Sequence, residues 1–225
     1  MSEIFAIWAI LYWAAQFSVV PIKPGTKAPA IKSWQAYAGS LPSEANRAKW
    51  ITDFADYGIG ILLGWLILAD QYLNAVDVDD DRLVPVVEML LFGNRKVRRA
   101  VKSAKKGKKG KTIFVRSPKG DGLRSVTLKG KNGLGNIDFL AGGRQTVLPP
   151  TIHPDLGQFY AWDGEELLKV DLNDLPVYGM DQHAILKTVV SSEHTLAIVE
   201  GVSTHEPALK LAQELQQTPK NLARG

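Results

Sequence analysis

The apolar positions near the start of the chain predict a helix and a strand that are both buried. No residue from 4 to 22 is charged, and this stretch indicates a helix over about 3–15 and a strand over 17–22. A second helix is expected over about 43–55, because Ser43 can accept a hydrogen bond from a free amide of its first turn. The chain therefore begins with an αβ unit.

The pattern beyond this unit is dominated by strands. A helix is expected from Asp81 to about Ala104, where apolar residues recur at helical spacing. The stretch 105–111, Lys-Lys-Gly-Lys-Lys-Gly-Lys, has two glycines and no apolar residue, so we expect it to be mobile. Strands are expected near 58–63, 65–78 with a break around 70–71, 112–116, 123–129, 136–140, 144–149 and 158–161. This order predicts an α+β fold with a mixed, mainly antiparallel sheet.

The last part of the chain differs from the rest. We expect one domain over 1–178 and a helical extension or linker over 179–225. Residues 204–217 have the apolar spacing of an amphipathic helix, with Pro207 in its first turn. The residues that follow have a composition typical of a linker that precedes another domain.

Composition limits the chemistry and the compartment. The 225 residues include no cysteine, so disulfides and thiolate metal sites are excluded, and a metal ion would take oxygen or histidine ligands. The uncharged stretch 4–22 raises the alternative of a membrane span. Gln16, Ser18 and Pro21 interrupt it and no basic segment precedes it. We expect a cytoplasmic protein without a membrane segment.

Charge is distributed unevenly along the chain. The net charge is +4, but the segment from Met89 to Gly120 holds twelve Lys or Arg and no acid. The remainder carries 15 basic and 23 acidic residues. A basic segment on an acidic body indicates a polyanionic partner.

Two aspartates at the end of an apolar strand are the candidate chemistry. Asp77 and Asp79 leave the same face of that strand, with Cα atoms about 6.6–6.8 Å apart, and Asp138 lies in a second short strand. Acids so close repel each other unless a cation offsets them. Three carboxylates on two strands are typical of a site for one or two hard divalent ions. The alternative is that such acids cap a strand end or a helix, as we expect for Asp80 and Asp81.

Several blocks of sequence follow one another between about residues 3 and 165. They are Val19-Val-Pro-Ile-Lys23-Pro-Gly-Thr-Lys27-Ala-Pro29, Asn46-x-x-x-Trp50, Tyr57-Gly-Ile-Gly-Ile-Leu-Leu-Gly64, Ala75-Val-Asp-Val-Asp-Asp80, Phe114-Val-Arg-Ser-Pro118, Asn136-Ile-Asp138 and Leu148-Pro-Pro-Thr-Ile-His153-Pro-Asp-x-Gly157-x-x-Tyr160-x-Trp162. In this order they resemble the bifunctional primase–polymerase (Prim-Pol) domain of the archaeo-eukaryotic primase superfamily. The last block is the most specific, because no composition bias generates it.

The resemblance implies a fold and an active site. The expected fold is an archaeo-eukaryotic primase-like catalytic domain, with an RRM-like core and the N-terminal αβ unit. Asp77, Asp79 and Asp138 would bind two Mg²⁺ or Mn²⁺ ions and catalyse nucleotidyl transfer.

The family's second motif departs from its pattern in this chain. A Gly-rich turn leads in the family to Arg-His, and the histidine contacts the phosphates of the incoming nucleotide. Here Ser117, Lys119 and Arg124 match a phosphate-binding turn, but Ser125 stands at the histidine position. A serine donates one hydrogen bond and carries no charge, so that contact would be weaker. Either another residue substitutes for the histidine, with Lys119 preferred over His153, or the enzyme is slower, or the protein is not a polymerase.

His153 and the lysines each have two interpretations. His153 either supports the Pro-rich turn around it, which lacks amide donors, or lies near the base or sugar of a nucleotide. Lys23 and Lys27 either belong to a solvated loop or line the nucleotide or template channel. The run that includes Lys105, Lys106, Lys108 and Lys109 is either a solvated segment or contacts template phosphates.

The sequence therefore predicts a metal-dependent DNA-directed primase/polymerase that uses nucleoside triphosphates and a single-stranded DNA template. The resemblance extends to phage and plasmid replication proteins, in which a helicase domain or partner often accompanies this domain. The first alternative is a nucleic-acid-binding module that kept the fold and is weakened in catalysis, as Ser125 suggests. The second is a metal-dependent hydrolase that uses the same carboxylates.

Overall fold

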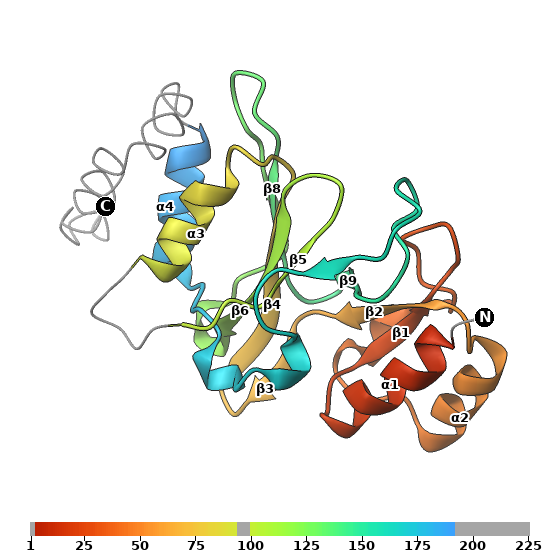
Figure 1. Cartoon of the computed structure of the whole chain (residues 1–225). Coiled ribbons are helices and arrows are strands. Elements are labelled where there is room, and N and C mark those ends of the chain that lie inside the picture. The colour runs from red at the N-terminus through yellow and green to blue at the C-terminus, as the bar shows by residue number, and fades with distance from the viewer. Residues whose placement is uncertain (1–2, 94–99, 192–225) are drawn as a thin grey trace.

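The protein folds into two lobes, each built around its own antiparallel sheet (Figure 1). The computed structural model describes residues 3–93 and 100–191. The N-terminal lobe holds helices α1 (Ile4–Ala14) and α2 (Glu44–Asp53) and a three-stranded antiparallel sheet in the order β1-β2-β9. These strands are β1 (Val19–Ile22), β2 (Gly58–Leu62) and β9 (Gln145–Leu148). Ser43 caps α2 as predicted, because its side chain accepts a hydrogen bond from the amide of Asn46.

The second sheet carries most of the remaining chain. Its strand order is β10-β5-β6-β4-β8-β7, with β3 also paired to β4, and every named pair is antiparallel. The strands are β3 (Trp65–Leu68), β4 (Gln71–Val78), β5 (Ala104–Lys106), β6 (Lys111–Pro118), β7 (Val126–Leu128), β8 (Ile137–Leu140) and β10 (Ala161–Trp162). The predicted α+β fold with mainly antiparallel sheets is confirmed.

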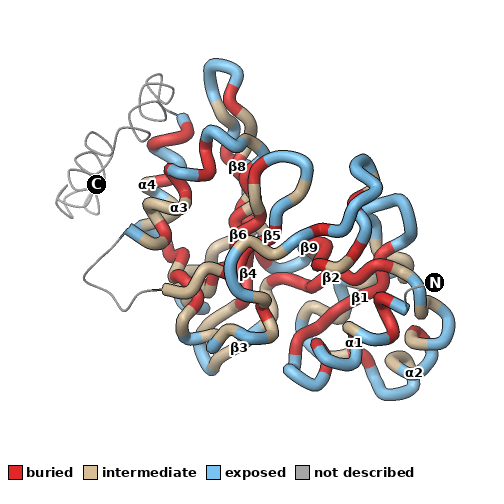
Figure 2. The backbone as a smooth tube through the Cα atoms, in the orientation of Figure 1, coloured by how far each residue is buried: buried red, intermediate tan, exposed pale blue. Residues whose placement is uncertain are grey.

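Two apolar cores cover opposite faces of this sheet. Leu73 and Ala75 of β4 belong to the core built with α1 and the smaller sheet. Val76 and Val78 belong to the other core, with helices α3 (Val84–Phe92) and α4 (Met180–Ser191). Side chains of a strand alternate between faces, so β4 supplies both cores at once. Figure 2 shows the resulting buried stretches along the central strands.

The basic segment is more ordered than its composition predicts. The helix expected over 81–104 is wrong at its end, because α3 ends at Phe92 and Ala104 begins β5; residues 94–99 lie outside the described part. The stretch 105–111, expected to be mobile, is the turn of the β5–β6 hairpin. Backbone hydrogen bonds to neighbouring strands order this segment, and the amino-acid composition does not indicate them.

The capping role predicted for Asp80 and Asp81 is also wrong. Helix α3 follows Leu83 and has no side-chain cap. Asp80 instead accepts hydrogen bonds from Arg82 and Gly135, and Asp81 accepts one from the amide of Gly110. Both acids connect the end of β4 to neighbouring loops.

The C-terminal part of the described chain packs on the second core. Tyr178, Leu186 and Val190 lie in the cluster that also contains residues of α3. The domain boundary predicted at residue 178 stays a prediction, and the helix predicted over 204–217 lies outside the described residues. Within 3–93 and 100–191, no helix is long and apolar enough to cross a membrane.

Candidate active site

The acids continue the face of β4 that covers the N-terminal core. Asp77 follows Leu73 and Ala75 on that face, and Asp79 lies just past the strand end. In the antiparallel ladders Asp77 is directly opposite Thr112 of β6 on one side and Asp138 of β8 on the other. Residues directly opposite each other share a face. The three acids predicted from sequence are therefore brought together where the apolar core ends.

Two threonines hold two of these carboxylates. The Thr112 hydroxyl donates to Asp77 Oδ1 at 2.5 Å, and the Thr127 hydroxyl of β7 donates to Asp138 Oδ1. Burial raises the pKa of Asp79, and the negative charges of Asp77 and Asp138 raise it further. The charge of Asp79 is thus disfavoured by its two neighbours, as expected of a site that gains a cation.

The carboxylates are not yet arranged as a cage. Among the residues that the structure describes, no group of three or more His, Asp or Glu side chains is gathered closely enough to hold a metal ion. The donors nevertheless fit a hard divalent ion, because all are carboxylate oxygens. Asp77 and Asp138 are directly opposite each other in the ladder, and the charges of both act on Asp79, two residues beyond Asp77. The assignment of Asp77, Asp79 and Asp138 as metal ligands stays a prediction.

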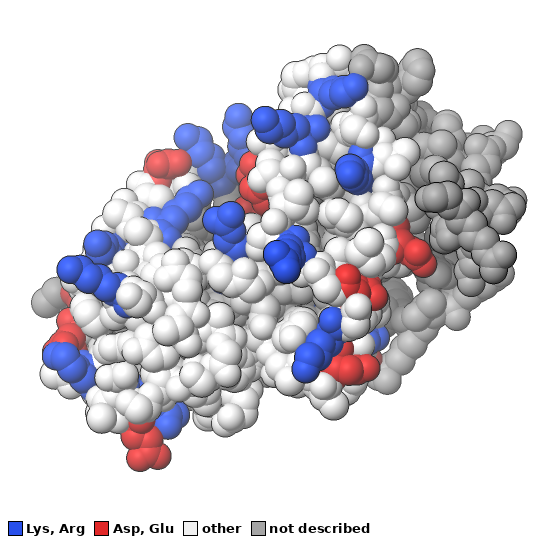
Figure 3. Space-filling view, turned by 180° about the vertical axis from the view of Figure 1, so that it is seen from behind, with Lys and Arg blue, Asp and Glu red and all other residues white. Residues whose placement is uncertain are grey.

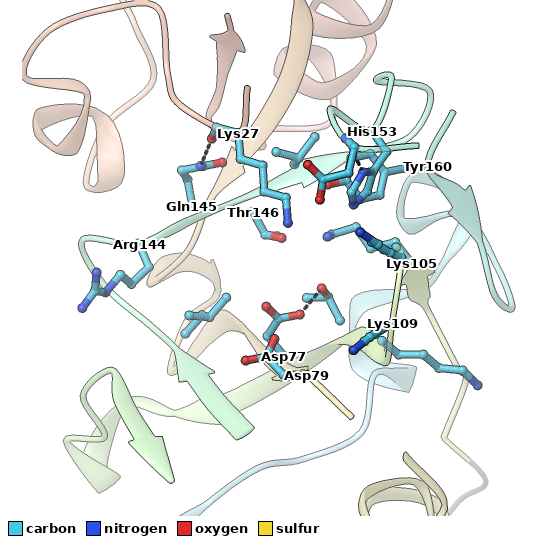
Figure 4. A pocket seen from close by; sticks show the side chains of 17 residues that line it. Lys27, Asp77, Asp79, Lys105, Lys109, Arg144, Gln145, Thr146, His153 and Tyr160 are labelled. Carbon is cyan, nitrogen blue, oxygen red and sulfur yellow. Dashed lines mark hydrogen bonds between the residues drawn. The ribbon is translucent and has the colours of Figure 1, made fainter. Parts of the chain in front are cut away.

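A cleft of about 490 Å³ lies above Asp77 and Asp79, between the two lobes, and Asp138 is not among its lining residues. It is lined by Asp77 and Asp79 together with six basic residues, Lys27, Lys105, Lys108, Lys109, Lys111 and Arg144. Lys27 and Lys105 point into it from opposite lobes (Figure 4). In Figure 3, Lys and Arg side chains gather around a hollow in the surface between the lobes. A basic cleft with an acidic floor suits a polyanion that arrives with metal ions.

Lys105 is the least ordinary of these cations. Its residue is 7% exposed, and its Nζ lies 4.7 Å from the centroid of the Tyr160 ring. Burial lowers the pKa of Lys105 to about 8, against an opposing effect of Asp77 and a further lowering by Lys27. The opposite wall carries Lys27, whose carbonyl accepts a hydrogen bond from Gln145.

His153 supports its turn and also lines the cleft. Its Nδ1 accepts a hydrogen bond from the amide of Asp155 at 3.1 Å, and its ring centroid lies 4.8 Å from that of Tyr160. With Nδ1 as acceptor, a neutral ring carries its proton on Nε2. Burial lowers the pKa of His153, and Lys27 adds to the effect. Both interpretations of His153 therefore have structural support.

The family comparison agrees with this architecture. The family model described as "Bifunctional DNA primase/polymerase, N-terminal" matches residues 9–177. The chain belongs to the Prim-Pol family. The match spans both lobes and includes all three acids and the lining residues of the cleft. No curated protein matches the chain.

Part of the predicted Prim-Pol phosphate motif lies away from the acids. Ser117 is buried and faces the opposite side of β6 from Thr112, and Lys119 is exposed beyond the end of that strand. At about 3.3 Å per residue, Lys119 lies roughly 23 Å along the chain from Thr112. Neither residue lines the cleft. The predicted triphosphate contacts of Ser117 and Lys119, and the substitution of Lys119 for the family histidine, are not supported.

The other half of that motif lies closer to the acids. Ser125 immediately precedes β7, and extending the ladder places it opposite Leu140, a residue that lines the cleft. Its hydroxyl accepts a hydrogen bond from the amide of Ala141 at 2.9 Å. Arg124 is exposed and does not line the cleft.

The predicted lysines divide in the same way. Lys27, Lys105, Lys108 and Lys109 line the cleft, whereas Lys23 and Lys106 are exposed outside it. Lys106 follows Lys105 on β5 and therefore faces the other side of the sheet.

Several site residues of this Prim-Pol domain were missed from sequence. Thr112 and Thr127 hold the carboxylates, and Arg144 and Tyr160 line the cleft. The register of the ladders identifies the threonines, and no sequence signal gives that register. Tyr160 lies in the last family block, which offered a signal for its importance.

Arg82 positions the acidic strands through Asp80. Its guanidinium donates to both Asp80 oxygens and to the carbonyl of Gly133. The Arg82 hydrogen bonds hold the pKa of Asp80 well below its usual range. Asp80 also accepts from Gly135, so this network ties the end of β4 to the loop that leads into β8 and Asp138.

Proposed function

We propose that this Prim-Pol domain is a metal-dependent DNA-directed primase/polymerase that extends chains on a single-stranded DNA template. The observation that carries the proposal is that Asp77 and Asp79 line the floor of a basic cleft, with Asp138 directly opposite Asp77 on the neighbouring strand. A volume of about 490 Å³ lies within the range of small-molecule and nucleotide pockets, roughly 300–1,000 Å³.

Divalent ions complete the proposed site. Asp77, Asp79 and Asp138 would hold two Mg²⁺ or Mn²⁺ ions, since oxygen ligands suit these ions better than zinc. Such ions, when bound, activate a 3′-hydroxyl and stabilise the triphosphate and its leaving oxygen. The chain's own contribution is to fix the acids through Thr112 and Thr127.

The cations of the cleft would bind the nucleoside triphosphate and the template. Lys27 faces the acids from the N-terminal lobe, and Lys108 and Lys109 extend the basic lining along the β5–β6 turn. Because Nδ1 of His153 accepts the Asp155 amide, Nε2 would be the ring nitrogen that donates to a nucleotide. We further propose a role in phage or plasmid replication in the host cytoplasm, with a helicase domain or partner.

Replacement of Asp77 tests the proposal. Asp77→Asn is expected to abolish nucleotide incorporation on a primed single strand, by at least about 10³-fold, because several kcal/mol of metal-dependent stabilisation are removed. Thermal unfolding should change little, since asparagine keeps the size of the side chain and removes a repulsive charge. Asp56→Asn, at an exposed acid outside the cleft, is the matched control. Incorporation that survives in Asp77→Asn would remove the metal assignment.

A catalytically weakened binding module is the second candidate, and the serine at position 125 favours it. The same assay separates the two, because such a module binds single-stranded DNA without metal-dependent incorporation. A hydrolase on these carboxylates would shorten the labelled strand instead of extending it.

A further inference from the structure

Lys105 is a buried cation with no ion pair among the residues that the structure describes. Lysine is seldom buried unless it is paired. Lys105 is 7% exposed, yet its neighbours are the Tyr160 ring at 4.7 Å and the longer-range charges of Asp77 and Lys27. It forms no ion pair with a carboxylate in the described part of the chain. A residue that costs this much to bury indicates a partner that arrives from outside.

The ladder register fixes where that partner would lie. A single row of directly opposed residues crosses five strands on the cleft face, and its members in order are Lys105, Thr112, Asp77, Asp138 and Thr127. Two strand spacings separate the Cα atoms of Lys105 and Asp77, about 10 Å in all. The ammonium of Lys105 and the carboxylate of Asp77 therefore face the same space but do not form an ion pair with each other. Figure 4 shows both side chains directed into the cleft.

Tyr160 holds the lysine in this direction. The ring lies beside the ammonium, and the strand that follows it pairs with β5 through Trp162 and Lys105. A cation over an aromatic face gains about 0.5–2 kcal/mol, less than a carboxylate would give, and keeps its donors for another ligand.

The position of Lys105 complements the departure at Ser125. Ser125 lies at the β7 end of the sheet, on the far side of the acids, and its hydroxyl already accepts the Ala141 amide. A serine side chain is neutral, so position 125 supplies no positive charge to the cleft. Lys105 brings one from the β5 side of the same acids.

We propose that Lys105, held by Tyr160, binds the phosphates of the incoming nucleoside triphosphate and supplies the positive charge that Ser125 lacks. This inference rests on the proposed function. The phosphate-binding cation of this chain thus comes from β5, across the acids from the position where the family pattern has a histidine.

Nucleotide binding to Lys105→Met tests the inference. Methionine keeps the length of the side chain and removes the charge. The probes are the four deoxynucleoside triphosphates and their monophosphates, each titrated separately by calorimetry with Ca²⁺ in place of a catalytic ion. We expect triphosphate affinity to fall by about 10- to 100-fold, the equivalent of one charge-assisted hydrogen bond of roughly 1.5–3 kcal/mol. Monophosphate affinity should change by less than about threefold, and Lys105→Arg should retain most of the triphosphate affinity.

The control is Lys187→Met, which removes an exposed lysine of α4 away from the cleft and should leave both affinities unchanged. Unchanged triphosphate affinity in Lys105→Met would overturn the inference, as would an equal loss for triphosphates and monophosphates. Loss of the folded state in both Lys105→Met and Lys105→Gln would identify a structural lysine and overturn it too.

Failure of this inference is distinguishable from failure of the proposed function. If the wild-type protein binds triphosphates and extends a primer while Lys105→Met binds equally well, only the role of Lys105 is wrong. If the wild-type protein neither binds triphosphates nor incorporates them, the proposed function fails.

Discussion

At the scale of single residues, the site combines groups that destabilise the fold in the absence of ligand. Asp79 lies beside two other acids, and Lys105 is a buried cation without an ion pair in the described part of the chain. Burial disfavours the charged form of each group, which is a recurrent property of functional sites. The carboxylate of Asp79 and the ammonium of Lys105 both line one cleft. A ligand made of metal ions and phosphates would therefore offset both charges.

Lys105 should make the free energy of unfolding increase as the pH rises from about 8 to 10.5. Its folded pKa, about 8, is below the unfolded value of 10.5, so the unfolded state binds more protons between these pH values and stability rises through that window. The free energy of unfolding of the wild type should gain about 3 kcal/mol relative to Lys105→Met as pH rises from 7 to above 10. The titratable groups near Lys105 are present in both proteins; they are Asp77 on β4, Lys27 after β1, Tyr160 and His153.

Urea unfolding of both proteins at several pH values in this window measures the effect. At pH 7 the Lys105→Met variant should be the more stable of the two, since it lacks the buried charge. A difference between the two proteins that stays constant with pH would contradict the burial of an unpaired ammonium.

The sequence predicted the side-chain directions that follow from alternation along one strand. It did not predict the positions that depend on pairing between segments distant in the sequence. Asp77 and Asp79 share a face because strand side chains alternate, and this was predictable. The burial of Lys105 depends on pairing with Trp162, which is remote in sequence, so composition alone predicted a solvated residue. Ser117 and Lys119 were assigned by motif order, but the extended strand β6 carries them away from the acids.

At the scale of elements, the β5–β6 hairpin decides where the cleft lysines lie. Gly110 allows its turn, with φ +59°, and an added Cβ would overlap the carbonyl oxygen of Val78. The Gly110 amide donates to Asp81. The turn is therefore fixed against the end of β4, next to the acids. A side chain at position 110 would require either the turn or the end of β4 to move.

Gly110→Ala should consequently destabilise the protein by more than about 2 kcal/mol, because it adds a backbone clash to an unfavourable φ. Gly120→Ala is the matched control, since nothing lies within 4 Å of its Cβ position and its φ is not positive; it should change stability by less than about 0.5 kcal/mol. Chemical denaturation of both variants measures these values. A Gly110→Ala protein as stable as the control would show that the turn is not packed on β4.

The element pattern was largely predictable, and the hairpin was the main exception. Helices α1 and α2 and strands β2, β4 and β8 lie close to their predicted bounds, because each has a clear apolar period or cap. The stretch 105–111 has neither. Its order comes from ladder bonds to β6 and β10, which a lysine-rich composition does not indicate.

At the scale of the whole molecule, the two cores create the cleft. The apolar face of β4 ends at Ala75 in the N-terminal core, and the next residue on that face is Asp77. The lobes therefore separate where the apolar side chains stop, and polar residues line the gap. The sequence predicted the fold class and the acids. It did not predict the cleft, because the pairing of β9 with β2 and the position of the 151–160 loop, which both supply lining residues, depend on contacts between distant segments.

The basic residues that line the cleft should make the affinity for single-stranded DNA depend on salt concentration. Lys111 is already paired with Glu88 and Asp163, at 2.8 and 2.6 Å, so Lys108 and Lys109 are the better candidates for phosphate contacts. The Lys108→Gln/Lys109→Gln protein should bind an oligothymidylate more weakly. The slope of log K against log salt should fall in magnitude by about 1.4, since each phosphate that is no longer neutralised accounts for roughly 0.7.

Fluorescence anisotropy of a labelled oligothymidylate between 50 and 200 mM salt, roughly the range over which such slopes are resolved, measures the effect. The control is Lys49→Gln/Lys187→Gln, which removes the same charge from exposed positions on α2 and α4. Because both double variants have the same net charge, a change in slope confined to the first locates the phosphate contacts in the cleft. Equal slopes in the two proteins would mean that only overall charge attracts the strand, and that Lys108 and Lys109 serve solubility.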